Sequence, residues 1–157
     1  MLKKYLQILD ESLDKKLEIL TQIEKLSRDQ AEMITSEAPF EEIDANMDSK
    51  AELIDQINRM DVGFTAMYDN MKVELEKDKD MYKDEIEGLK KKITSVMEKS
   101  TTIEAVEARN KTAMEKRFAI EHKSNSDKIT KASAALDYYN VANRLNVVTP
   151  QFLDSKK

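Results

Sequence analysis

Few side chains in this chain have the type and spacing that catalysis or metal binding requires. The one histidine, His122, lies in a polar stretch, whereas a general base needs a pocket that a narrow helical bundle rarely offers. A di-iron bundle needs a Glu-x-x-His pair on each of two helices, which one histidine cannot supply. Asp78 and Asp80 lack the glycine and the spacing of a calcium loop. We therefore expect no enzymatic activity and no catalytic, metal or cofactor site, and we expect Glu41-Glu42, Asp78 and Asp80 to be helix-surface charges.

The methionines are the more informative set. The chain has nine, and many lie at or near apolar positions of a helical pattern. Two interpretations stay open. They fill an ordinary core, or they form an adaptable surface, because methionine repacks readily against different partners. The methionines concerned are Met47, Met60, Met67, Met71, Met97 and Met114.

Charge and cysteine content narrow the class of partner. The formal net charge is −5 and the pI is about 5.1, which disfavours nucleic acid, since phosphates require a basic face. The clusters Lys15-Lys16 and Lys90-Lys91-Lys92 are interleaved with acids, so we expect solvated helix faces there. The chain has no cysteine, no apolar run of membrane-spanning length and no secretory leader pattern. We expect a cytoplasmic protein without stable membrane insertion.

The composition predicts long helices. Only two glycines and two prolines occur among 157 residues, while 36 % are charged. We predict an all-α fold, an elongated antiparallel helical bundle or coiled coil of three long helices with a shorter C-terminal helical segment. The whole chain, 1–157, is predicted as one helical domain. The predicted parts are helices at about 2–35, 39–76 and 79–122, a helical segment at about 126–146, and a mobile tail at 149–157.

The first predicted helix carries an apolar stripe on one face. Pro39 marks the break between this helix and the next. The residue before a proline avoids the helical region, and proline itself fits the first turn of a helix. The short connection predicts that the first two helices are antiparallel neighbours. The stripe consists of Leu2, Leu6, Leu9, Leu13, Leu17, Leu20, Ile23 and Leu26.

In the second predicted helix the apolar spacing alternates between four and three residues, which is a heptad pattern. Gly63 lies inside it, and we expect this glycine to let a neighbouring helix come close. The charged stretch 74–79 contains no glycine or proline. It is compatible with a turn near Lys77-Asp78, which we favour, or with one continuous helix into the third. The heptad positions are Leu53, Ile57, Met60, Phe64, Met67 and Met71.

The third predicted helix has a clear apolar pattern up to Ile103, after which the pattern weakens. The segment at 126–146 differs from the three helices because it is apolar on two opposed faces. One face can lie on the bundle while the other takes a partner helix. The predicted partner-binding residues are Ile129, Leu136, Tyr138, Tyr139, Val141, Leu145 and Val148.

Three stretches of the chain resemble the FlgN-type flagellar export chaperones. That family has a leucine-rich first helix, a short turn, and a second helix with a lysine followed by aliphatic residues. The region 104–110 is similar to its third helix, and the resemblance covers about Leu2 to Phe118. The matching runs are Tyr5-Leu6-x-x-Leu9 and Phe40-x-x-Ile43-x-x-x-Met47-x-x-Lys50-x-x-Leu53-Ile54-x-x-Ile57-x-x-Met60.

The resemblance implies a function. Such chaperones keep hook-associated (filament-junction) proteins unpolymerised and deliver them to the flagellar export gate. Their C-terminal part binds the client, and by position this part corresponds to Ile129–Leu145. A competing class is a homodimeric coiled-coil scaffold without a client. The weakening of the heptad pattern after Ile103 favours the binding protein, since a rod would keep its heptads.

Overall fold

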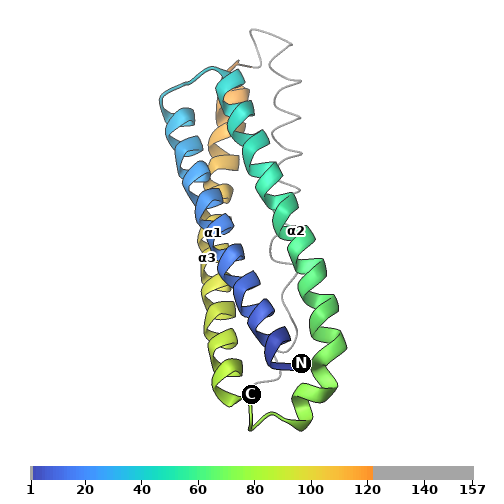
Figure 1. Ribbon diagram of the computed structural model, residues 1–157. Coiled ribbons are helices and arrows are strands. Elements are labelled where there is room, and N and C mark those ends of the chain that lie inside the picture. The colour runs from blue at the N-terminus through green and yellow to red at the C-terminus, as the bar shows by residue number, and fades with distance from the viewer. Residues whose placement is uncertain (1, 122–157) are drawn as a thin grey trace.

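The computed structural model describes residues 2–121, which form three long helices (Figure 1). They are α1 (Leu2–Thr35), α2 (Phe40–Lys77) and α3 (Lys83–Glu121), and no strand occurs in this part of the chain. The predicted all-helical class is confirmed. The predicted segment at 126–146 and the tail at 149–157 lie outside the described residues.

The connection between α1 and α2 is a tight C-cap followed by proline. The Ala38 N–H donates to the Met33 carbonyl at 2.9 Å and the Glu37 N–H to the Ile34 carbonyl at 3.2 Å. These two bonds form a Schellman motif, which needs a left-handed residue at its C′ position. Glu37 occupies that position with a φ of 57°. Pro39 then caps α2, and its carbonyl accepts from the Glu42 N–H.

A turn separates α2 from α3, so the continuous helix that the sequence left open does not form. The Asp78 N–H still donates to the Glu74 carbonyl, as in the preceding helix. The Met81 and Tyr82 N–H groups then both donate to the Asp78 carbonyl, which tightens the chain before Lys83. The turn covers residues 78–82, and Asp78 and Asp80 are exposed there as charges.

Side-chain contacts define how the helices run. Between α1 and α2, Lys16 pairs with Asp61 and the Leu26 carbonyl with Asn46, so the two helices point in opposite directions. Between α1 and α3, Lys92 reaches Asp10 and Asn110 reaches the Ser27 carbonyl, so these two point the same way. Helix α1 packs closely along both other helices, whereas α2 and α3 approach each other at few points.

Apart from Ile19, the buried positions of α1 form a regular heptad pattern that differs from its leucine stripe. Leu17 and Leu26, predicted for the core, are only half-buried. Lys16, Ser27 and Gln30 are buried, because they continue the three-and-four spacing where the leucines depart from it. The buried heptad positions are Leu2, Leu6, Leu9, Leu13, Lys16, Leu20, Ile23, Ser27, Gln30 and Ile34.

Helix α3 shows the same behaviour. The inference that the helix loses its heptads after Ile103 is wrong, since the buried positions continue at heptad spacing to Met114 and on to Phe118. Glu107 and Asn110 occupy two of these positions. The apolar pattern fades there because polar side chains enter the core, and the helix packing itself does not change.

The left-handed Glu37 gives a test of the α1–α2 connection. A non-glycine residue in this conformation costs about 1–2 kcal/mol, part of which glycine loses again through its freer unfolded chain. We expect Glu37→Gly to raise the free energy of unfolding by roughly 0.5–1 kcal/mol. Glu37→Ala keeps the strained Cβ and should stay near the parent value in urea unfolding followed by circular dichroism. Equal effects of the two substitutions would contradict the Schellman assignment.

Candidate functional site

None of the partner-binding residues predicted from the sequence lies in the described part of the chain. These residues, and His122, fall beyond Glu121, so their arrangement stays a prediction. They are Ile129, Leu136, Tyr138, Tyr139, Val141, Leu145 and Val148. The described helices instead present two features of their own: a layer of buried polar side chains across the bundle, and a half-buried apolar stripe along α2.

The polar layer centres on Lys50 of α2, whose side chain is 0 % exposed. Its Nζ donates to Glu107 Oε1 of α3 at 2.8 Å and to Gln30 Oε1 of α1, so one ammonium group joins all three helices. Two amides extend the layer to the backbone of α1. We use the name polar layer for Ser27, Gln30, Asn46, Lys50, Glu107 and Asn110.

The amides of the polar layer hold α1 from both sides. Asn46 Nδ2 of α2 donates to the Leu26 carbonyl at 2.9 Å, and Asn110 Nδ2 of α3 donates to the Ser27 carbonyl at 2.8 Å. A heptad slip of either helix would break these bonds and leave buried polar groups unpaired. The layer therefore determines the register of the bundle, much as a buried polar residue determines the register of a coiled coil.

The polar layer fixes the packing of the helices, but burying its polar groups also costs desolvation free energy. Burial lowers the pKa of Lys50, although the neighbouring Glu107 carboxylate opposes that shift. Ser27 Oγ, Asn46 Oδ1 and Glu107 Oε2 are buried without a hydrogen-bond partner. Such groups retain part of their desolvation penalty, so the layer contributes specificity of packing more than net stability.

A second buried ion pair joins α1 to the middle of α2. Lys16 Nζ lies 2.7 Å from Asp61 Oδ1, and the two side chains are 8 % and 9 % exposed. The expectation that Lys15-Lys16 forms a solvated face is wrong for Lys16, which sits at a heptad position, while Lys15 is exposed. Heptad spacing, followed through polar residues, was the sequence signal that could have found it.

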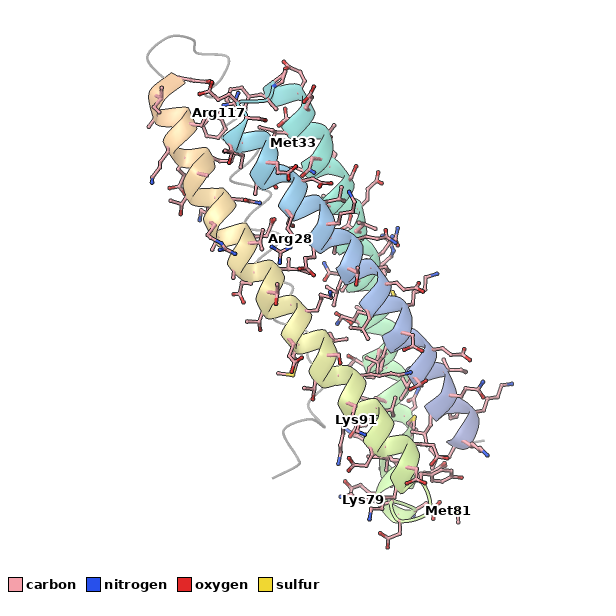
Figure 2. All side chains as sticks on the ribbon, turned by 90° about the vertical axis from the view of Figure 1, so that its left-hand side faces the viewer. Arg28, Met33, Lys79, Met81, Lys91 and Arg117 are labelled. Atoms are coloured by element: carbon pink, nitrogen blue, oxygen red, sulfur yellow. The ribbon has the colours of Figure 1, made fainter. Side chains whose placement is uncertain are left out.

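The basic cluster on α3 divides in the same way. Lys91 projects from the surface (Figure 2), whereas Lys92 is half-buried and bridges two α1 carboxylates, Asp10 at 2.7 Å and Asp14 at 2.9 Å. Lys99 makes a further link to Glu24 of α1 at 2.9 Å. The α1–α3 contact is thus lined by lysines from α3 that meet acids from α1.

An aromatic contact closes the end of the bundle that holds the α1–α2 connection. The rings of Phe40 and Phe118 stack with centroids 5.2 Å apart, and the Arg117 guanidinium lies 4.2 Å from the Phe40 ring centroid. Figure 2 shows Arg117 at the same end as Met33, with Lys79 and Met81 at the other. Together with Lys50–Glu107, these contacts join the first half of α2 to α3.

The second feature is an apolar stripe on α2 beside its core positions. Its members recur about every seven residues, so they share one side of the helix, and each is only half-buried. We call this the α2 stripe, made of Leu53, Met60, Met67 and Leu75. A half-buried apolar line on a helix is a surface that another helix can complete.

The methionines divide between the two interpretations that the sequence left open. Met47, Met71 and Met114 are buried and fill the core. Met60 and Met67 belong to the α2 stripe, and Met97 is 45 % exposed on α3. Core filling thus describes one subset, and a surface available for repacking describes the other.

The described residues show neither a metal site nor a membrane-spanning helix. Residues 2–121 contain no group of three or more acidic or histidine side chains arranged to hold a metal ion. None of the three helices combines the length and the apolar character needed to cross a membrane. Glu41 and Glu42 are exposed in the first turn of α2, where carboxylates interact favourably with the helix dipole.

The polar layer predicts a strongly non-additive mutant cycle. Lys50→Met leaves Glu107 and Gln30 buried without their cation, and Glu107→Leu leaves the Lys50 ammonium without its carboxylate. We expect each single substitution to lower the free energy of unfolding by roughly 3–5 kcal/mol, and the double substitution to lower it less than either one. Urea unfolding measures the free energy of unfolding of the parent, the two single variants and the double variant. Lys92→Met, which breaks a more exposed pair, should cost only about 0.5–1 kcal/mol, and additive single effects at Lys50 and Glu107 would refute the pairing.

The Glu24 carboxylate predicts how stability changes in acid. Hydrogen bonds from Lys99 and then Arg28 hold the pKa of Glu24 below its usual value of 4.5. A group with a lowered folded-state pKa stabilises the fold above its unfolded pKa, and this contribution is lost as pH falls through the folded value. We expect Glu24→Gln to lower stability at pH 6, with the difference from the parent shrinking below about pH 4. Glu18→Gln, which removes an exposed charge from the same helix, is the control. A difference that stays constant from pH 6 to pH 3 would contradict the assignment.

Comparison with known proteins leaves the resemblance to FlgN-type chaperones resting on the residues quoted for it. No protein-family model, no curated protein and no solved structure matches the chain. Of the residues in those stretches, Lys50 and Glu107 meet in the polar layer. The described part of this chain is an all-helical bundle with a buried polar layer and an apolar stripe on α2.

Proposed function

We propose that this chain is a cytoplasmic, non-enzymatic export chaperone of the FlgN type. It binds hook-associated (filament-junction) proteins, prevents their premature assembly and delivers them to the flagellar export gate. The observation that carries the proposal is the α2 stripe, a half-buried apolar line on a helix that α3 approaches at few points. The resemblance of the sequence supplies the identity of the client.

The physical requirements of helix binding agree with this surface. An amphipathic client helix lays apolar residues at heptad spacing into a groove, and the α2 stripe offers members at about that spacing. Two of its four members are methionines, which adapt to different partner side chains. A disordered client loses conformational entropy when it folds onto the chaperone, so affinity is moderate and release remains feasible.

The segment at about 126–146 completes the proposed architecture. In this proposal it is a shorter helix, and with it the chain 1–157 forms one elongated antiparallel bundle. One apolar face then covers the bundle and the opposed face, with Tyr138, Val141, Leu145 and Val148, receives the client.

The coiled-coil scaffold keeps one observation in its favour. The heptad pattern does not fade after Ile103, and therefore no longer distinguishes a binding protein from a rod. A homodimer would form through the α2 stripe of two chains. Against it, the core positions are already covered within one chain, with Leu20, Ile23 and Ile54 each 0 % exposed, so the main heptad positions need no second copy.

Binding to purified hook-associated proteins tests the proposal. Size-exclusion chromatography with light scattering should show a defined complex with the full chain, which a truncation ending near His122 does not form. The double variant Met60→Glu/Met67→Glu should weaken binding at least tenfold, because two charges would enter an apolar contact.

Val62→Glu/Val73→Glu is the matched control for that experiment. It adds the same charges to the same helix at positions that are 71 % and 62 % exposed, so binding should be unchanged. If the full chain binds no hook-associated protein and elutes as an elongated dimer that Met60→Glu/Met67→Glu dissociates, the scaffold is correct and the chaperone proposal fails.

A further inference from the structure

The C-terminal part of α2 is packed more thinly than the rest of that helix. In residues 62–77 only Phe64 and Met71 are buried, and Val62 and Val73 are largely exposed. We call residues 62–77 the distal segment. The preceding part of α2 buries far more side chains: Phe40, Ile43, Asn46, Met47, Lys50, Ile54, Ile57 and Asp61.

A glycine stands at the start of the distal segment without a packing reason. Among residues 2–121, nothing lies within 4 Å of a Cβ added at Gly63, and the backbone there is not left-handed. The expectation that Gly63 lets a neighbouring helix come close is therefore wrong. Glycine is the weakest helix former after proline, so the residue lowers the cost of interrupting the helix at this point.

Among the described residues, the buried ion pairs of α2 end just before that glycine. The Lys16–Asp61 pair is the last buried ion pair along α2 in the described chain, and Lys50–Glu107 lies further back. Beyond Asp61, the ion pair Lys72–Asp69 joins two residues of α2 itself and is half exposed to solvent. The other end of the distal segment is followed by the non-helical turn at 78–82.

We propose that the distal segment opens as a unit, hinged at Gly63, while residues 40–61 remain packed. Three independent observations meet at this boundary: dense packing ends, buried ion pairs end, and a glycine occurs that neither packing nor backbone conformation requires. Few buried apolar contacts are the physical basis of low local stability. Opening uncovers Phe64 and Met71 and frees Met67, so it enlarges the apolar surface of α2.

Opening of the distal segment is a motion of the free chain and does not depend on the identity of a client. It is expected for a chaperone and for a scaffold alike. It differs from simple fraying of a helix end, because the predicted boundary is internal and lies at one residue. Fraying would give protection that falls gradually from Asp61 to Lys77, whereas hinged opening gives one common value across the segment.

Hydrogen exchange on the full chain, read by mass spectrometry at several low urea concentrations, tests the proposal. Amides of residues 64–75 should exchange with one common rate that urea hardly changes, because local opening exposes little new surface. Amides of residues 43–57 should exchange more slowly and respond strongly to urea. A urea dependence for 64–75 that equals that of 43–57 would overturn the proposal.

Gly63→Ala and Gly88→Ala form a matched pair of variants. Each puts the same methyl group into a helix interior where nothing lies within 4 Å, so both raise helix propensity without strain. Gly63→Ala should slow exchange of residues 64–75 about four- to fivefold. Gly88→Ala lies in α3 and should leave those rates unchanged while slowing residues 43–57. Equal slowing of 64–75 by both variants shows that the segment exchanges only through global unfolding, and refutes the hinge.

Discussion

The buried ammonium group of Lys50 is the interaction on which the arrangement of this bundle depends. It links α2 to Glu107 of α3 and to Gln30 of α1 in a region from which water is excluded. A charge at such a place is tolerated only when its partners are in position, so the three helices have one register in which Lys50 is paired. Hydrophobic burial brings the helices together, but apolar heptads by themselves would accept several registers.

The remaining features are ordered around that layer. Toward the connection at Pro39, the stacked pair Phe40 and Phe118 and the Arg117 guanidinium join α2 to α3. In the other direction, Lys16–Asp61 holds α2 to α1, and beyond it α2 keeps few buried residues. Stability is therefore unevenly distributed along one helix, which is where a protein can move without unfolding. The α2 stripe extends from the densely packed part of α2 into the distal segment.

This distribution would suit the proposed function, in which the chain holds another helix and releases it. A tightly packed bundle offers no surface for a client, and a loose one would not keep its own core dry. Here the α1–α3 contact is close and lined by lysine–carboxylate pairs, while the apolar line on α2 stays half-buried. Binding through such a line gains apolar burial at little cost in polar desolvation. The acidic surface of the chain is consistent with protein partners and unfavourable for phosphate backbones.

The helical class and the break at Pro39 could be predicted from the sequence, because scarce glycine and proline, abundant charge and apolar spacing are local properties of the chain. Tertiary structure decided which polar residues belong to the core. Lys16, Gln30, Lys50 and Glu107 look like solvated polar side chains when each is considered alone, and they are buried only because partners from other helices meet them. Pairing across helices depends on register, which is a property of three segments together. For the same reason the apparent end of the pattern after Ile103 was misleading. Apolar spacing marks where hydrophobic burial drives packing, whereas the polar layer needs the assembled bundle before its charges are stabilised.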